Sequence, residues 1–140
     1  MDVRIVLARW SDFQGAEVIL LDTPAVLWLL GENRRTESLI ASGLPLLASP
    51  VSLLEIRFLI EAGKVRIAES DWEVRLSRDR RFRIDECRIG AIVAAASELG
   101  FTRDPFDRLI AGHAVARGYR LATADALLLE HLPRARVFPL

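Results

Sequence analysis

Short apolar segments separated by helix signals recur along this chain of 140 residues, and this alternation constrains its fold most strongly. The clearest segments are residues 18–21, 46–49 and 119–122. Uninterrupted apolar runs of this kind are typical of strands that are buried on both faces of a parallel sheet. Strands that alternate with helices need crossover connections, which cover both faces of the sheet with helices. The sequence therefore predicts an α/β fold, a three-layer α/β/α sandwich with a central, mostly parallel sheet.

Helix boundaries follow from capping residues, which satisfy the free backbone groups at helix ends. Thr23 predicts the start of one helix, and Ser52 with Glu55 has the spacing of a capping box at the start of another. Asp85 and Asp104 predict two further N-termini. Together with closing glycines, these signals predict helices over residues 25–30, 36–42, 52–63, 70–78, 85–99, 104–118 and 126–132, and short strands over residues 80–84 and 136–138.

The length suits one domain, since 140 residues can bury a self-sufficient core and leave little room for a second one. We expect residues 17–140 to form this single domain. Residues 1–16 precede the first clear apolar strand and form an N-terminal extension. Val3, Ile5 and Leu7 recur at every second position there, which makes the extension a candidate edge strand.

Charge and cysteine content exclude several classes of partner and site. Lys+Arg and Asp+Glu are balanced at 19 each, so no overall positive field attracts nucleic acid. Cys87 is the only cysteine, which excludes an internal disulfide and a cysteine-based zinc site. The chain shows neither a secretory signal nor an uncharged apolar stretch of about 18 residues, the length that spans a membrane. We therefore expect a soluble cytoplasmic protein without a membrane partner.

Several carboxylates lie where they can converge. Asp22 follows the first apolar strand and Asp125 follows the last clear one, and the carboxyl ends of parallel strands meet at one edge of a sheet. On a helical wheel of about 100° per residue, Glu55 faces the apolar side of its helix. Asp107 lies at the border of the buried stripe of its own helix. These positions predict that the four side chains line one cleft.

Each carboxylate also has a purely structural interpretation, because Asp and Glu are common at helix caps. Glu55 would complete a capping box, Asp104 would precede a proline as an N-cap, and Asp125 would cap the last helix. A cap explains a backbone contact but not the direction of Glu55. A carboxylate on an apolar face must be paired, protonated or bound to a metal ion, because its burial alone is too costly.

Clustered carboxylates repel one another and raise their own pKa values unless a cation lies between them. Hard divalent ions such as Mg²⁺ and Mn²⁺ prefer these oxygen ligands. Two such ions about 3.5–4 Å apart activate a water molecule and stabilise the leaving oxygen of a phosphodiester. The carboxylates thus predict Mg²⁺- or Mn²⁺-dependent hydrolysis that needs no histidine, cysteine or lysine.

Three blocks of the sequence occur in the order of a known family. They read LLDTPAVLWLL over residues 20–30, SPVSLLEI over residues 49–56 and RDPFDRLIAGHAVARGYRLATAD over residues 103–125. In these blocks the chain resembles the PIN-domain ribonucleases, and specifically the VapC-like toxins of type II toxin–antitoxin systems. The resemblance extends over about residues 18–138 and implies a single PIN-like nuclease domain.

The resemblance implies a metal-dependent endoribonuclease with Mg²⁺ or Mn²⁺ as its cofactor and RNA as its substrate. It also implies a homodimer that is restrained by a cognate antitoxin protein. The acidic residues that match the catalytic and metal-binding positions of the family are Asp22, Glu55, Asp107 and Asp125. Asp104 matches a frequent accessory acid, and Thr123 matches a hydroxyl that supports the site.

Two departures from the family pattern concern the first block and the N-terminus. Pro24 occupies the position at which related first blocks often have histidine, so no role of that side chain is carried over. The extension over residues 1–16 is also longer than is usual in the family. Neither departure removes any of the acidic residues.

Arginines supply the candidate contacts to RNA. Arg80, Arg81 and Arg83 belong to the densest basic run, which suits either an RNA backbone or an exposed surface without a ligand. Arg108 follows one of the carboxylates directly, which makes it the better candidate for contacting phosphate or positioning a carboxylate.

The alternative function is that of a catalytically silent PIN-like protein-interaction module, which keeps the fold and uses the cleft to hold a partner. The presence of all four carboxylates favours the enzyme. His113 lies on the apolar stripe of its helix, so we expect a packed core histidine rather than a ligand or a base.

Overall fold

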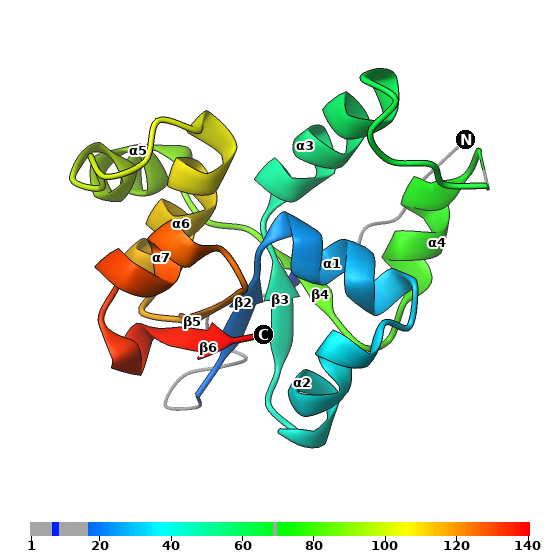
Figure 1. Cartoon of the computed structure of the whole chain (residues 1–140), viewed down its shortest axis with the longest axis horizontal. Helices are drawn as coiled ribbons and strands as arrows, with labels where there is room; N and C mark the ends of the chain where they lie inside the picture. Colours follow the sequence, from blue (N-terminus) through cyan, green and yellow to red (C-terminus); the bar gives the residue numbers. More distant parts are fainter. Residues whose placement is uncertain (1–6, 9–16, 69) are drawn as a thin grey trace.

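A six-stranded sheet forms the centre of the molecule (Figure 1). We describe residues 7–8, 17–68 and 70–140 of a computed structural model. The strand order is β1-β4-β3-β2-β5-β6, and every neighbouring pair is parallel, which confirms the predicted parallel sheet. The strands are β1 (Leu7–Ala8), β2 (Ile19–Leu21), β3 (Leu46–Ala48), β4 (Arg83–Asp85), β5 (Arg120–Thr123) and β6 (Val137–Pro139).

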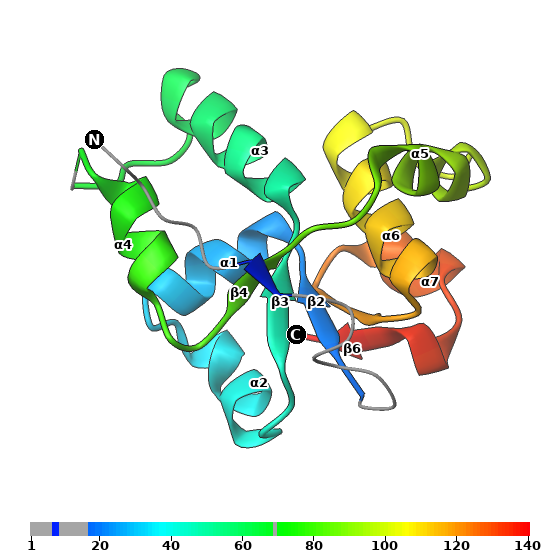
Figure 2. The same ribbon diagram turned by 180° about the vertical axis from the view of Figure 1, so that it is seen from behind.

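Helices cover both faces of the sheet. Helices α1 to α4 lie on one face, and α5 to α7 lie on the other (Figures 1 and 2). No helix in the described ranges is long and apolar enough to cross a membrane. The helices are α1 (Thr23–Leu30), α2 (Glu37–Ala41), α3 (Pro50–Glu61), α4 (Trp72–Arg78), α5 (Ile89–Ser97), α6 (Pro105–Arg117) and α7 (Ala126–His131), with the 3-10 turns η2 (Arg34–Thr36) and η3 (Arg134–Arg136).

The central strand β2 serves two hydrophobic cores. Ile19 and Leu21 belong to the core beneath α1 to α4, whereas Leu20 belongs to the core beneath α6 and α7. This division follows from the strand geometry, since successive side chains point to opposite faces. Leu20 also pairs in register with Leu47 of β3 and Leu121 of β5. The predicted three-layer α/β/α arrangement is therefore confirmed.

Two predicted helix starts lie later than the real ones. Asp22, and not Thr23, caps α1, and its carboxylate accepts a backbone N–H at 2.9 Å. Ser49, and not Ser52, caps α3, and its hydroxyl accepts a backbone N–H at 3.2 Å. A proline occupies the first turn of both helices and allows this earlier start. Glu55 is consequently a mid-helix residue and not part of a capping box.

The prediction that Asp85 caps a helix is wrong. Asp85 is the last residue of β4, and α5 begins only at Ile89. The Asp85 side chain is fully buried, forms an ion pair with Arg117 of α6 and contacts His113 of the same helix at 2.8 Å. Its carboxylate is therefore committed to a partner helix and is unable to cap the helix that follows it in sequence.

The N-terminal extension is described only at Leu7–Ala8. These two residues form β1, which runs parallel to β4 at the edge of the sheet. The rest of the candidate edge strand, including Val3 and Ile5, lies outside the described residues.

Gly112 marks a very close approach between α6 and α5. A Cβ atom at Gly112 would lie 2.8 Å from the carbonyl oxygen of Ile92 and 2.9 Å from Cβ of Ala96. Gly112→Ala is therefore expected to lower the free energy of unfolding, measured by urea titration, by about 1–3 kcal/mol. Gly90→Ala in α5 is the matched control, because a Cβ atom there meets nothing within 4 Å. The control should gain about 0.5–1 kcal/mol, and an equal gain by both variants would contradict the close packing.

Candidate metal centre

Five carboxylates line one pocket of about 450 Å³ at the carboxyl edge of the sheet. They come from separate elements, because each crossover returns the chain to the same edge. Asp22 follows β2 directly, Glu55 lies in α3, Asp104 and Asp107 lie at the start of α6, and Asp125 lies two residues beyond β5. The structure thus brings together the four carboxylates that were singled out as catalytic and the accessory Asp104.

Glu55, Asp104 and Asp107 form the tightest group in the pocket. Each offers one carboxylate oxygen, and these three oxygens all lie within 4.8 Å of one another. Asp104 also caps α6, because its Oδ1 atom accepts the backbone N–H groups of Phe106 at 2.9 Å and Asp107 at 3.1 Å. The sequence predicts Asp104 to be an accessory residue, whereas the structure places it among the three carboxylates whose oxygens lie closest together.

Asp22 lies at the back of the pocket and is only 3% exposed. Burial raises its pKa to about 6, although hydrogen bonds from the Thr123 side chain and the Ala25 backbone act in the opposite direction. The hydroxyl oxygen of Thr123 also accepts the backbone N–H of Asp125 at 3.0 Å. Thr123, at the end of β5, therefore contacts the Asp22 carboxylate and the backbone of Asp125.

Asp107 is the carboxylate whose pKa is most clearly raised. Burial raises the pKa of Asp107 to about 7, and repulsion from the other four carboxylates of the pocket adds to the effect. Burial also raises the pKa of Glu55, which Asp104 increases further and a hydrogen bond from Thr23 opposes. Asp125 caps α7 by accepting the Leu128 N–H at 3.0 Å. The carboxylates of the pocket therefore repel one another.

The donor set of the pocket fits a hard divalent cation. All five candidate ligands are carboxylates, which Mg²⁺ and Mn²⁺ prefer, and none is a thiolate or an imidazole. A cation placed among them would relieve the repulsion that raises the pKa of Asp107. The geometry and the electrostatics therefore point to the same kind of ligand.

Affinity for Mn²⁺ is expected to rise between about pH 5 and pH 8, because metal ligands must lose their protons. The raised pKa values of Asp107, about 7, and Asp22, about 6, place this competition between proton and metal near neutral pH. Calorimetric titration at several pH values, in two buffers of different ionisation enthalpy, measures both the affinity and the number of protons released. An affinity that stays constant over this range would contradict the assignment of these carboxylates as ligands.

A buried polar network that the sequence did not reveal connects the start of α3, the end of β4 and α6. The His113 ring contacts Ser49 Oγ at 2.9 Å through Nδ1 and Asp85 Oδ2 at 2.8 Å through Nε2. Arg117 donates two hydrogen bonds of 3.0 Å to the same Asp85 carboxylate. His113 is a buried core histidine, as expected, but its two ring nitrogens are both engaged. The available signal was that Asp85, like Asp22, directly follows an apolar residue near the end of a strand.

This network joins the two helices that carry Glu55 and Asp107. Ser49 caps α3 and His113 belongs to α6, so their hydrogen bond fixes the helices at one end. At the other end, Phe58 and Phe106 pack edge to face with ring centroids 5.4 Å apart. The two carboxylates lie between these contacts along their helices, which holds them together despite their repulsion.

The predicted RNA-binding arginines do not line the acidic pocket. Arg108 faces α5, where its guanidinium donates hydrogen bonds to the carbonyl oxygens of residues 96 and 97. Arg80, Arg81 and Arg83 line a separate pocket at the start of β3 and β4, which is the opposite edge of a parallel sheet. Arg81 is also paired with the neighbouring Asp79. A site that combined these arginines with the carboxylates is therefore not formed within this chain.

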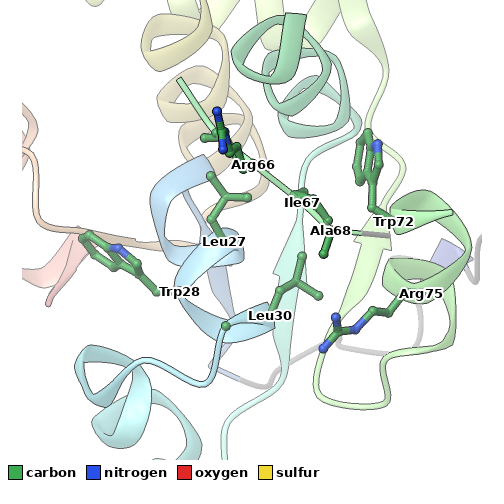
Figure 3. A pocket seen from close by; sticks show the side chains of 10 residues that line it. Leu27, Trp28, Leu30, Arg66, Ile67, Ala68, Trp72 and Arg75 are labelled. Atoms are coloured by element: carbon green, nitrogen blue, oxygen red, sulfur yellow. The ribbon is translucent and has the colours of Figure 1, made fainter. Parts of the chain in front are cut away.

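An apolar pocket of about 440 Å³ lies beside the acidic one. Figure 3 shows Leu27 and Leu30 of α1 on one side of it and Ile67 and Trp72 on the other. Trp28 lines both this pocket and the acidic pocket. The two pockets are thus neighbours that share one aromatic side chain.

Comparisons with known proteins agree with this architecture. A family model described as PIN domain matches residues 19–133. One similar solved structure is VapBC2 from Rickettsia felis, which is bound to a DNA fragment from the promoter of these proteins. Its matching chain is 18% identical at a TM-score of 0.61, and the match covers 88% of this chain and 98% of that chain. A chain of DNA-bound VapBC from Salmonella typhimurium is 21% identical at a TM-score of 0.58, with the same coverage of 88% and 98%. A chain of a toxin–antitoxin complex from Klebsiella pneumoniae is 19% identical at a TM-score of 0.58, with coverage of 86% and 95%. No curated protein matches the sequence at a significant level.

Proposed function

This chain belongs to the PIN-domain family, whose model matches residues 19–133, and from that premise we propose that it is a metal-dependent endoribonuclease. The observation that carries the proposal is the convergence of five carboxylates in one pocket, where burial and mutual repulsion raise the pKa of Asp107 to about 7. Strongly shifted pKa values in a pocket are typical of functional sites. With cellular RNA as its substrate, the enzyme would act in the cytoplasm.

The residues of the pocket would have different roles in such an enzyme. Bound Mg²⁺ or Mn²⁺ would supply an activated water molecule and a positive charge beside the leaving oxygen of the phosphodiester. Glu55, Asp104 and Asp107 would hold the cation, since their oxygens lie within 4.8 Å of one another. Asp22 and Asp125 form the remaining acidic wall, and Thr123 contacts the carboxylate of Asp22 and the backbone of Asp125.

Cleavage of labelled oligonucleotides tests this function. We expect the purified protein to cut single-stranded RNA in the presence of Mg²⁺ or Mn²⁺, to stop when a chelator is added, and to leave single-stranded DNA of the same sequence intact. Calorimetric titration with Mn²⁺ separates the alternative function, because a catalytically silent interaction module need not bind the ion. A protein that neither binds Mn²⁺ nor cuts RNA would be such a module.

We further propose that the enzyme is the toxin of a toxin–antitoxin pair, because similar folds occur in the VapBC and toxin–antitoxin complexes described above. The apolar pocket supports this proposal, since it offers α1 and α4 side chains to a protein segment. A segment bound there would reach the acidic pocket past Trp28, which lines both. Expression of the chain alone should stop bacterial growth, and co-expression of the adjacent gene's product should restore it.

The proposed toxin would act as a homodimer. Ile89 and Val93 support this proposal, because they lie one turn apart on α5 and are 63% and 48% exposed. Apolar side chains of this size that share an exposed helix face are typical of a protein interface. Sedimentation of the purified chain would measure its oligomeric state.

A further inference from the structure

Among the described residues that line the acidic pocket, Arg35 is the one cation. Its guanidinium carbon lies 4.7 Å from the centre of the Trp28 ring, which is a cation–π contact. The side chain is exposed, and none of the salt bridges found within residues 17–68 and 70–140 involves it. The guanidinium therefore keeps its charge available at the rim of the pocket.

The turn that carries Arg35 is built to bring it back over α1. Glu32 has φ 54°, a left-handed conformation that no other non-glycine residue of the described chain adopts. The N–H of Asn33 then donates to the Trp28 carbonyl oxygen at 2.8 Å, and the Asn33 side chain accepts the Arg35 N–H at 3.0 Å. Thr36 anchors the turn, since it is 2% exposed and its hydroxyl donates to the Asn33 carbonyl oxygen at 2.7 Å.

Within residues 17–68 and 70–140, none of the salt bridges joins Arg35 to a carboxylate of the pocket. A cation that lines an acidic pocket without an ion pair to its carboxylates is available to an anion that enters together with the metal ion. The proposed cleavage brings RNA phosphates to this pocket, which makes a backbone phosphate the anion expected beside Arg35.

We propose that Arg35 binds a backbone phosphate of the RNA strand whose neighbouring phosphodiester is cut in the acidic pocket, and that Trp28 holds the guanidinium in place for this contact. The inference rests on the ribonuclease function proposed above. A guanidinium suits the role because it donates two parallel hydrogen bonds to phosphate oxygens. Contact with Trp28 limits the conformations of the long side chain before RNA binds, which reduces the entropy lost on binding.

Arg34 provides a matched control for this role. It precedes Arg35 in the same turn and carries the same charge, but its side chain is 94% exposed and faces Glu37 at 3.9 Å. Arg35→Gln should raise KM for a single-stranded RNA about 3- to 10-fold and leave kcat within about twofold, as expected for a charge-assisted contact that persists in the transition state. Arg34→Gln should change neither value.

The salt dependence gives a second readout that a merely structural residue would not move. In Arg35→Gln, the slope of log(kcat/KM) against log of the salt concentration should become shallower by about 0.7, the value for one phosphate contact to a single strand. Arg35→Lys should keep the wild-type slope, because it keeps the charge, while its KM rises less than that of Arg35→Gln. Affinity for Mn²⁺, measured by calorimetry without RNA, should stay within about twofold in every variant.

The outcomes separate this inference from the function on which it rests. If the wild type cleaves RNA and Arg35→Gln has the same KM and salt slope as Arg34→Gln, the phosphate contact is overturned and the ribonuclease function stays intact. Loss of Mn²⁺ affinity in Arg35→Gln would assign the residue to the metal site instead and would equally overturn the contact. Unchanged RNA kinetics with weaker antitoxin binding would make Arg35 a protein contact. Absence of cleavage by the wild type would overturn both proposals.

Discussion

Asp107→Asn is expected to lower the rate constant of RNA cleavage about a thousandfold, which corresponds to about 4 kcal/mol of transition-state stabilisation. Asparagine has nearly the shape of aspartate, but it lacks the charge that a divalent cation needs beside Glu55 and Asp104. The three side chains form the closest group of oxygens in the pocket. Single-turnover cleavage at saturating metal concentration measures the loss directly.

The same substitution should leave the metal-free protein folded and more stable above about pH 7. The pKa of Asp107 is raised to about 7 by burial and by its neighbours, so the folded state holds a proton that the unfolded chain has released. The contribution of Asp107 to stability therefore falls as the pH rises from about 4, which is the pKa of an aspartate in the unfolded chain, through about 7, which is the pKa of Asp107 in the folded state. Thermal unfolding at pH 8 measures this gain and separates lost catalysis from lost structure.

Asp71→Asn is the control for this substitution, because Asp71 is exposed and does not line the acidic pocket. It removes the same charge from the chain and should leave both cleavage and metal binding unchanged. Wild-type cleavage by Asp107→Asn would contradict the role given to the pocket.

Asp85→Ala is expected to lower the free energy of unfolding by about 3–5 kcal/mol, the cost of breaking a buried ion pair by removing one partner. Asp85 and His113 are fully buried, and Arg117 donates two hydrogen bonds to the Asp85 carboxylate. Truncation removes the partner of the buried His113 Nε2 atom and the acceptor of these two Arg117 hydrogen bonds. Urea titration of wild type and variant gives the difference.

The pH dependence of this network has the opposite sign to that of Asp107. Burial alone would raise the pKa of Asp85, but hydrogen bonds from His113 and Arg117 hold it below its usual value. The stability that Asp85 contributes is thus present above the unfolded-state pKa of about 4 and is lost as the pH falls further. In Asp85→Ala, the free energy of unfolding should therefore decrease less steeply than in the wild type as the pH is lowered below about 4.

Glu73→Gln provides the control for the buried pair. Glu73 forms an ion pair with Arg57, and both side chains are nearly half exposed, at 45% and 44%. Such exposed pairs contribute about 0–1 kcal/mol, so this variant should remain close to wild type. A loss of stability in Asp85→Ala no larger than in the control would contradict the account of the buried network.

The architecture could be predicted because it depends on local patterns. The apolar run before Asp22 and the apolar run before Asp125 indicate buried strands, and the parallel order brings their carboxyl ends to one edge. The helical wheel placed Glu55 toward the interior, and its side chain indeed lines the pocket. The helix starts were less predictable, since Ser49 and Ser52 are both adequate caps and only the position of the preceding strand decides between them.

The remaining features depend on contacts between segments that are distant in sequence. Asp85 has the sequence signature of a cap, and only its position against Arg117 of α6 shows that it is a buried ion-pair partner. Arg108 follows a carboxylate in sequence, yet its direction is set by the carbonyl groups at the end of α5. Arg35 carries no signal of its own, because the turn that brings it over Trp28 needs the left-handed conformation of Glu32.

Cleavage of RNA is proposed to depend on a divalent cation bound in the pocket that five carboxylates line. The most direct test is the rate of cleavage of one labelled RNA by metal-stripped protein as Mn²⁺ is added, measured side by side for wild type and Asp107→Asn. Wild-type cleavage should appear with Mn²⁺ and saturate, while the variant should stay about a thousandfold slower at every concentration. Equal rates for the two proteins, or wild-type cleavage in the presence of a chelator, would contradict this proposal.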